Sequence, residues 1–442
     1  MKFMKWLLVI VTICLANEQS FAQEQTLKLT PGTRMQVVDS LSSSLRKNYV
    51  FLDTAIKMGD YIKKRLKGGT YNAFTNPNQF AQALNADLHA VYDDRHLLIR
   101  YDPQMEKSLQ DTSNTERDLR HGEDMHFAQQ QNFGFRKIEI LSGNIGYVYF
   151  DRFFSVNERS SETVNSVFSF LKNTNALIID LRINGGGDPE MVKYICSYFF
   201  KTKTHINDLY ERRKNKTDQF WTEPVNNSDT FTSIPIFVLV SRHTFSGAEE
   251  FSYDLQSLHR ATIIGETTGG GAHPVSPEMI SNGFIGNIPF ARAINPVTGK
   301  NWEAIGVKPD VQINADSALD AATLSYYDHQ INTSRDSSTV KTIKWSRDML
   351  NAKLHPFNTD TTILKTYIGN YADRIITFEN SRLYLKGSDN KKLKLIALSQ
   401  TFFKLDNTDN LKLEFLKNPE GKVNEIAVIF DDGFVAKYKR KE

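Results

Sequence analysis

Cysteine is almost absent from this 442-residue sequence, which contains only Cys14 and Cys196. Cys14 lies in the apolar stretch from Trp6 to Ala16, which follows two lysines and precedes a Ser-Phe-Ala sequence that ends at Ala22. A charged, an apolar and a small-residue segment in this order predict a secretory signal over residues 1–22. Cleavage there leaves one cysteine, which excludes an intrachain disulfide, so the exported chain must be stable through its core alone.

An excess of charge of either sign is also missing. Lys and Arg number 54 and Asp and Glu 51, which gives a net charge of +3, and no long basic run occurs. This balance argues against a nucleic-acid partner. The apolar stretch before Ala16 is too short for a bilayer span, and no other segment is apolar enough. Ile13 precedes Cys14 where a lipoprotein signal requires a small residue, so lipidation at Cys14 is disfavoured and we expect a location in the periplasm or outer cell envelope.

Hydrophobic periodicity divides the exported chain into five segments. Residues 23–101 have the spacing of helices, and residues 102–136 form a polar connection. Residues 137–330 alternate between apolar strands and amphipathic helices, which predicts an α/β core with a parallel sheet. Residues 331–362 are polar and linker-like, and residues 363–442 hold about seven or eight short strands, which predicts a small all-β sandwich or barrel.

Two details of the core bear on function. Ligands of parallel α/β sheets bind beyond the carboxyl ends of the strands, so the loops at those ends are the candidate site. Near the end of the core, the segments Gly283 to Ala291 and Ile294 to Trp302 predict a hairpin that turns around Asn295 to Gly299.

The central stretch of the core is a strand followed by a serine and a helix. Ile236 to Val240 reads as a buried strand, and Ser246 and Gly247 open the helix Ala248 to Leu258. A serine at such a junction is either an ordinary N-cap or a nucleophile with an oxyanion hole at the helix N-terminus. Oxyanion donors are available in the N–H of Gly247 and in the Gly-rich loop Asn184 to Gly187, which follows another strand.

A serine nucleophile requires a base, for which histidine is the usual residue. The sequence has ten histidines, so composition alone does not choose among them. His96 lies where a predicted helix meets a short apolar strand. His243 lies on the loop before Ser246, and His273 follows the second Gly-rich loop, Thr267 to Ala272.

Four ordered motifs resemble one family. ALIIDLRINGGGD, VLVSRHTFSGAEEF, IIGETTGGGA and WEAIGVKPDV are similar to the C-terminal processing (tail-specific) serine peptidases, over about Leu141 to Ile313. The resemblance implies a crotonase/ClpP-like α/β core. It also implies that Ser246 is the active-site nucleophile, with oxyanion donors at Gly247 and at Gly186 or Gly187.

The best-known branch of that family takes its base from a lysine in the motif T-x-G-K-G. Here the lysine position falls on Gly270 or Gly271, so that dyad is excluded. A second branch, which includes the tricorn core protease and the interphotoreceptor retinoid-binding protein, uses a histidine from an N-terminal helical domain and a later glutamate. Those positions match His96, in DDRHL, and Glu303. No segment has the length of the PDZ domain that other members carry.

The sequence therefore predicts an exported serine endopeptidase that acts on peptide or protein substrates and needs no metal or cofactor. Ser246 is the predicted nucleophile, His96 the base and Glu303 the orienting acid. One alternative is a non-catalytic protein of the same fold that binds an apolar ligand or a peptide, because a fold does not fix a function. Acyl-CoA chemistry is another, but export argues against it. The oligomeric state and the role of the β domain are not indicated.

Overall fold

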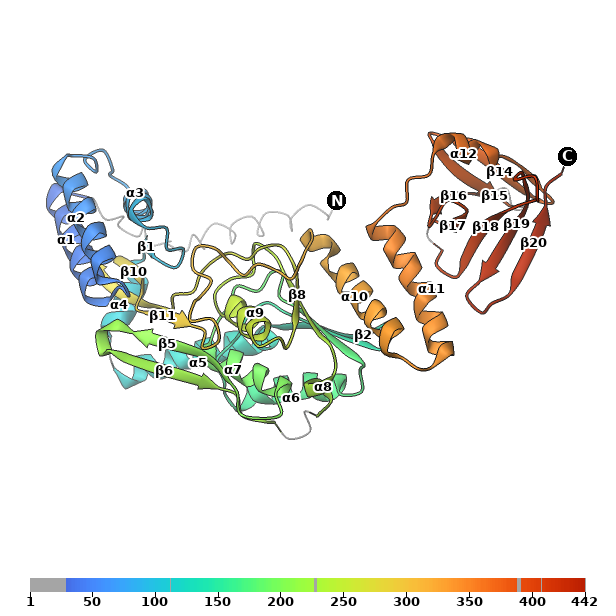
Figure 1. Cartoon of the computed structure of the whole chain (residues 1–442). Helices are drawn as coiled ribbons and strands as arrows, with labels where there is room; N and C mark the ends of the chain where they lie inside the picture. The colour runs from blue at the N-terminus through green and yellow to red at the C-terminus, as the bar shows by residue number, and fades with distance from the viewer. Residues whose placement is uncertain (1–28, 112, 226–228, 388–390, 407, 442) are drawn as a thin grey trace, which may run out of the picture. The chain divides into compact units, whose positions relative to one another are not determined.

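The computed structural model describes residues 29–441 apart from 112, 226–228, 388–390 and 407 (Figure 1). The predicted signal, residues 1–22, lies outside the described residues. Contacts divide the chain into two compact units. The first runs up to Glu116 and includes Val275–Phe290, and the second comprises Arg117–Pro274 and Ala291–Glu442. No helix of the described chain is both long and apolar enough to cross a bilayer.

The first unit is built on three helices, α1 (Pro31–Asn48), α2 (Leu52–Lys67) and α3 (Pro77–Val91). Helix α1 has proline in its first turn and a threonine N-cap, and α3 begins in the same way after an asparagine. Strand β1 (Leu98–Tyr101) follows α3, and α4 (Pro103–Gln110) follows β1. The apolar faces of the helices share one core with Phe284 and Ile288 from the inserted hairpin.

The predicted hairpin around Asn295 is wrong. Strands β9 (Val275–Ser281) and β10 (Phe284–Pro289) form the hairpin instead, and β10 also pairs with β1. Their turn is Asn282-Gly283, and both residues have positive φ, which is what a tight two-residue hairpin turn requires. The following strand, β11 (Ala291–Ile294), pairs antiparallel with β5 (His205–Glu211).

The second unit contains the predicted α/β core. Its six-stranded sheet has the order β12-β8-β7-β4-β3-β2, parallel except for the β2–β3 pair. The strands are β2 (Phe135–Leu141), β3 (Ile145–Phe150), β4 (Ala176–Asp180), β7 (Ile236–Val240), β8 (Thr262–Gly265) and β12 (Val311–Gln312). Alternate residues of each strand face opposite layers. Helices α6 (Glu158–Leu171), α7 (Pro189–Cys196) and α9 (Gly247–Ser257) pack on one face, and α10 (Ala318–Thr333) packs on the other.

Several helices lie in segments that the sequence analysis read as polar connections. The connection over residues 102–136 contains α4 and α5 (Asn114–Gln130), and the linker over residues 331–362 contains α11 (Ser337–Leu354). The remaining short elements are β6 (Lys216–Trp221), α8 (Asp229–Ser233), α12 (Thr361–Thr366) and the 3-10 turns Asn132–Gly134, Ser197–Phe199, Arg212–Lys214 and Ala315–Ser317.

The all-β prediction for the C-terminal segment is confirmed. Eight strands pair antiparallel in chain order. A β-bridge between Tyr371 and Arg440 pairs the first strand with the residue that follows the last strand. Large aromatic residues, among them Tyr367 and Phe415, fill the interior of the β domain. The strands are β13 (Gly369–Tyr371), β14 (Arg374–Glu379), β15 (Arg382–Lys386), β16 (Lys392–Ala397), β17 (Phe402–Leu405), β18 (Leu411–Lys417), β19 (Val423–Phe430) and β20 (Val435–Lys439).

Candidate active site

Ser246 lies at a sharp turn between β7 and α9. Its backbone has φ 54° and ψ −123°, whereas an ordinary N-cap residue has an extended backbone. Positive φ is uncommon for a residue other than glycine, and such strained residues cluster at active sites. The turn therefore has the strained strand-to-helix geometry of a nucleophile elbow, although the glycine two residues before the serine is absent.

The loop after β4 packs directly against this turn. A Cβ atom added to Gly186 would lie 2.6 Å from the backbone nitrogen of Gly247 and 2.7 Å from the carbonyl oxygen of Phe245. A Cβ atom at Gly187 would overlap the carbonyl oxygen of Phe153. Both glycines also have positive φ, so side chains are excluded there by conformation and by space.

The N–H groups of the loop differ in what they bind. Gly185 donates to the carbonyl oxygen of Asp151 at 3.2 Å, and Gly186 donates to Oδ1 of Asn184 at 2.8 Å. The N–H groups of Gly187 and Gly247 donate to no acceptor in the described chain. These two groups are neighbours, since a Cβ atom on Gly247 would lie 3.1 Å from the nitrogen of Gly187. The pair can therefore hold an oxyanion next to Ser246.

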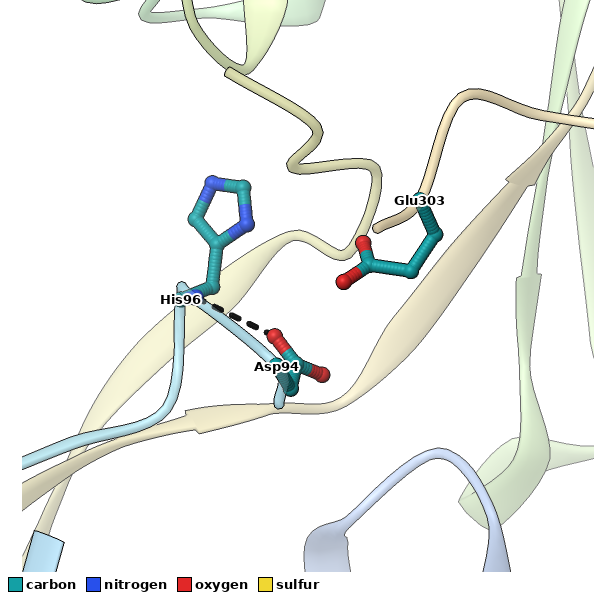
Figure 2. Close-up of side chains that lie close together, drawn as sticks. All are labelled: Asp94, His96 and Glu303. Atoms are coloured by element: carbon teal, nitrogen blue, oxygen red, sulfur yellow. Dashed lines mark hydrogen bonds between the residues drawn. The ribbon is translucent and has the colours of Figure 1, made fainter. Parts of the chain in front are cut away.

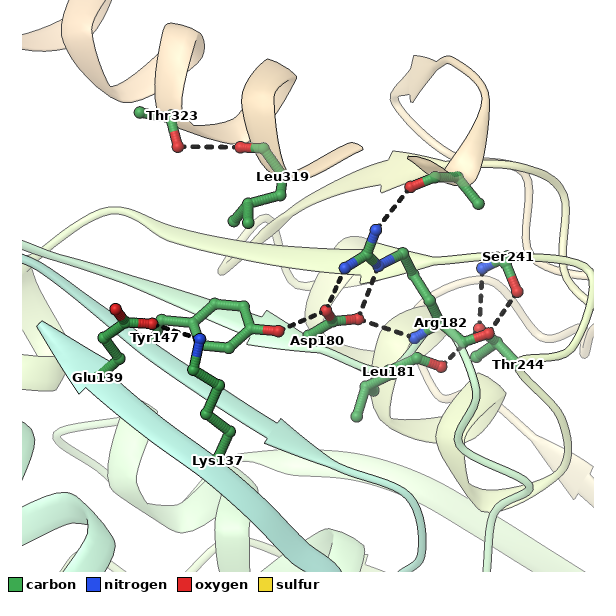
Figure 3. A network of polar contacts seen from close by, with 11 residues as sticks. Lys137, Glu139, Tyr147, Asp180, Leu181, Arg182, Ser241, Thr244, Leu319 and Thr323 are labelled. Atoms are coloured by element: carbon green, nitrogen blue, oxygen red, sulfur yellow. Dashed lines mark hydrogen bonds and ion pairs between the residues drawn. The ribbon is translucent and has the colours of Figure 1, made fainter. Parts of the chain in front are cut away.

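A polar network joins the loops that follow β4 and β7 (Figure 3). The hydroxyl of Ser241 donates to the carbonyl oxygen of Arg182, and the hydroxyl of Thr244 donates to that of Leu181 at 2.8 Å. The guanidinium of Arg182 is itself held by the carboxylate of Asp180 through bonds of 2.9 and 2.6 Å. Thr244 occupies the position where an elbow usually has glycine, and these contacts fix its backbone.

Glu249 is a site residue that the sequence analysis did not select, although it lies in the first turn of α9. Its side chain is fully buried and accepts a hydrogen bond from the N–H of Ser246 at 2.9 Å. Burial raises the pKa of this carboxyl to about 6, although the hydrogen bonds that it accepts lower it. An acid three residues after an N-cap position is the sequence signal of a capping box, and that signal was present.

Glu303 lies in the second unit and is not a surface acid. Its Oε2 atom accepts from the N–H of Ala272 at 2.6 Å and lies 3.4 Å from Nδ1 of His273. The side chains of Glu303 and His273 are 6% and 1% exposed. The preceding Trp302 is buried and donates its indole N–H to the carbonyl oxygen of Gly271 at 2.7 Å, so it anchors this segment on the second Gly-rich loop.

His96 belongs to the first unit, in the turn between α3 and β1. Its backbone N–H donates to Oδ1 of Asp94 at 3.1 Å (Figure 2), and Oδ2 of Asp94 accepts from the hydroxyl of Tyr49 at 2.9 Å. Asp94 is fully buried, so these bonds fix the turn that carries the imidazole. His243 is exposed in the second unit, and its Nε2 atom accepts from Arg242 at 3.3 Å.

Two family models match the chain. Residues 144–313 match peptidase family S41, and residues 19–130 match the N-terminal domain of peptidase S41 in eukaryotic IRBP. The chain therefore carries a peptidase S41 domain and an S41 N-terminal domain. The S41 domain contains Ser246, Glu303 and the Gly-rich loops, and the N-terminal domain contains His96. The match supports a serine-type peptidase.

The chain has relatives among known proteins. Over 179 residues it is 27% identical to tricorn protease of Thermoplasma volcanium, which covers 40% of this chain and 16% of that protein. Over 184 residues it is 28% identical to the chloroplastic carboxyl-terminal-processing peptidase 2 of Arabidopsis thaliana, which covers 38% of this chain and 32% of that protein. The chain thus spans less than two thirds of the length of either relative.

Solved structures are similar at lower identity. The photosystem II D1 C-terminal processing protease matches 66% of this chain and 94% of its own, at 15% identity and a TM-score of 0.42. The tricorn protease matches 65% of this chain and 35% of its own, at 14% identity and a TM-score of 0.42.

Proposed function

We propose that the chain is an exported serine endopeptidase that hydrolyses peptide or protein substrates through an acyl-enzyme. Ser246 is the nucleophile, His96 the general base and Glu303 the orienting acid. One observation carries the proposal: Ser246 lies on a strained turn beside the N–H groups of Gly187 and Gly247, which have no acceptor in the described chain. An ordinary N-cap serine requires neither feature.

The reaction follows from these groups. Ser246 Oγ attacks the scissile carbonyl carbon while His96 takes its proton, and the N–H groups of Gly187 and Gly247 stabilise the oxyanion. His96 then protonates the leaving amine, and a water molecule, activated by the same imidazole, hydrolyses the acyl-enzyme. Gly186 was a third candidate donor, but its N–H is bound to Asn184, so its role is to shape the loop.

Support for His96 and Glu303 comes from their motifs and from the family domains in which they lie. The burial of Glu303 agrees with the role of an orienting acid, because a carboxylate away from water interacts more strongly with an imidazolium. Export rests on the predicted signal at residues 1–22. The charge balance of the chain supports a peptide partner better than a nucleic acid.

The proposal is tested with a fluorophosphonate probe, which reacts only with an activated serine. We expect the purified protein to be labelled at Ser246 and to cleave an unfolded protein substrate, and we expect Ser246→Ala to lose both properties. A folded wild-type protein that is neither labelled nor proteolytic would support the alternative, a binding protein of the same fold for an apolar ligand or a peptide.

A further inference from the structure

The carboxylate of Glu249 binds four donors that come from two different segments. Its Oε2 atom accepts from the N–H groups of Ser246 at 2.9 Å and Gly271 at 2.8 Å. Its Oε1 atom accepts from the N–H of Gly270 at 2.6 Å and from the hydroxyl of Thr268 at 2.5 Å. An ionised carboxylate has about four acceptor positions, so this one is fully used.

These bonds connect the nucleophile turn to the second Gly-rich loop, residues 267–272. The first donor is the backbone of the nucleophile itself, and the other three belong to the loop. The loop continues to Ala272, whose N–H binds Glu303 at 2.6 Å, and the carbonyl oxygen of Gly270 accepts from Ala304 at 3.0 Å, one residue after Glu303. A single buried carboxylate therefore links the position of Ser246 to the position of Glu303.

No cation contributes to this arrangement. Within the described chain, no lysine, arginine or histidine forms an ion pair with Glu249. Its charge is instead compensated by three backbone N–H groups, a hydroxyl and the N-terminal end of α9, where an acid in the first turn is favoured by the helix dipole. A buried carboxylate that is held in this way is costly to remove, because several donors then lose their acceptor together.

We propose that Glu249 is a positioning residue for the peptidase reaction. It holds the strained Ser246 turn and the second Gly-rich loop, which binds Glu303, in one fixed arrangement. It contacts neither substrate nor the reacting atoms, and it acts through the backbone of Ser246 and of the loop. This inference rests on the proposed function. If the inference is correct, loss of the carboxylate reduces the reactivity of Ser246 more than it reduces substrate binding. The reason is that a small displacement of a nucleophile greatly lowers its reaction rate.

The experiment compares four variants. Glu249→Gln keeps the size of the side chain but replaces one acceptor oxygen with an NH₂ group. That group is itself a donor and cannot accept from the N–H groups that it faces. Thr268→Val removes one donor to Glu249, and Thr268→Ser restores the hydroxyl. Glu250→Gln is the matched control, because Glu250 is the adjacent buried acid of the same helix and accepts from Asn207 instead.

The measurements are the rate of fluorophosphonate labelling at Ser246, kcat and KM for a peptide substrate, and thermal unfolding. We expect Glu249→Gln to lower kcat and the labelling rate by about 10- to 100-fold while KM stays within about twofold. Thr268→Val should fall between this variant and the wild type in kcat and labelling rate, and Thr268→Ser and Glu250→Gln should keep the wild-type kcat, KM and labelling rate. A merely structural role would lower the unfolding temperature and leave the kinetics of the folded fraction unchanged.

The outcomes separate the two proposals. If the wild type is active and the folded Glu249→Gln protein is labelled at the wild-type rate, the positioning role is wrong and the proposed function stands. If Glu249→Gln does not fold, the comparison of Thr268→Val with Thr268→Ser decides, and equal rates for that pair overturn the role. If the wild type itself is neither labelled nor active, both proposals fall.

Discussion

Glu250 and Asp254 lie one helical turn apart on α9, and both carboxyl groups are buried. Among the described residues, neither carboxylate forms an ion pair with a lysine, arginine or histidine. Asn207 donates to Oε1 of Glu250 at 2.9 Å, and Asn295 donates to Oδ1 of Asp254 at 3.0 Å. The other carboxylate oxygen of Asp254, Oδ2, has no hydrogen-bond partner in the described chain. Two buried and adjacent carboxylates cannot both be ionised at low cost, so the pair retains a proton.

The surroundings of the pair strengthen this effect. Burial is the main cause that raises the pKa of Glu250, to about 7, and the negative charges of Asp188, the N-cap of α7, and Glu190, in its first turn, add to it. Burial and then the charge of Glu250 raise the pKa of Asp254 well above its usual value. The buried thiol of Cys196 on α7 also interacts with the pair, and burial, followed by the charges of Asp254 and Glu250, raises its pKa. No group in this set supplies a positive charge.

Stability should therefore fall as the pH rises. Between the unfolded-state pKa of a glutamate, near 4.5, and the folded value of about 7, the folded chain binds more protons than the unfolded chain. Stability contributed by the protonated pair is present at low pH and is lost through this window, on the order of 2 kcal/mol. Thermal unfolding from pH 5 to pH 8 measures it, and Glu250→Gln should flatten the decline and raise the unfolding temperature at pH 8. An equal slope in that variant would contradict the assignment.

Ser246→Gly should stabilise the fold while it abolishes activity. The φ and ψ of Ser246, 54° and −123°, cost little for glycine and are strained for serine. Relief of that strain is worth about 1–2 kcal/mol, less the entropy that glycine adds to the unfolded chain. Denaturant unfolding of Ser246→Gly and Ser246→Ala makes the comparison, because alanine removes the hydroxyl but keeps the strain. Equal stability of the two variants would show that the turn is relaxed.

The fold could be predicted where periodicity was strong and local. The strand Ile236–Val240 has the predicted bounds, and the helix predicted over Ala248 to Leu258 spans Gly247–Ser257, since the apolar residues of each follow the pattern of the element. The hairpin at Asn282-Gly283 was missed although its turn signal was present, because Pro277 interrupts the first strand. Helices α5 and α11 were missed because they are mostly polar, and polarity without a clear stripe also describes a loop.

The candidate site was predictable in its parts but not in its connections. Ser246 and the loop of Gly186 and Gly187 were chosen from motifs, and the structure brings them together. Which N–H groups are available depends on hydrogen bonds that sequence does not reveal, such as the bond from Gly186 to Asn184. Glu249 looked like an ordinary first-turn acid, because nothing in the sequence indicates that its carboxylate meets a loop that begins 18 residues later.

Gly187 and Gly185, in the loop Asn184 to Gly187, have very different surroundings. They therefore offer a matched test of the oxyanion donor. At Gly187 an added Cβ would overlap the carbonyl oxygen of Phe153, and φ is 144°. At Gly185 no atom lies within 4 Å of an added Cβ. Gly187→Ala should therefore displace the oxyanion donor and reduce kcat by at least about 100-fold, the effect of losing one such donor. Gly185→Ala should retain activity, and similar losses in both variants would argue against Gly187 as the donor.

A comparison of substitutions at His96 and His273 decides which histidine is the general base. His96 carries the motif, whereas His273 is the imidazole that lies 3.4 Å from Glu303 within the second unit. If His96 is the base, His96→Gln should lower kcat by at least about 1000-fold, because the serine then loses its proton acceptor. His273→Gln should cost less than about tenfold, since a glutamine amide can still donate to Glu303. Steady-state kinetics with each variant, after far-UV circular dichroism has confirmed folding, measure the difference. The reverse order of effects would assign the base to His273, and the catalytic pair would then lie entirely within the S41 domain.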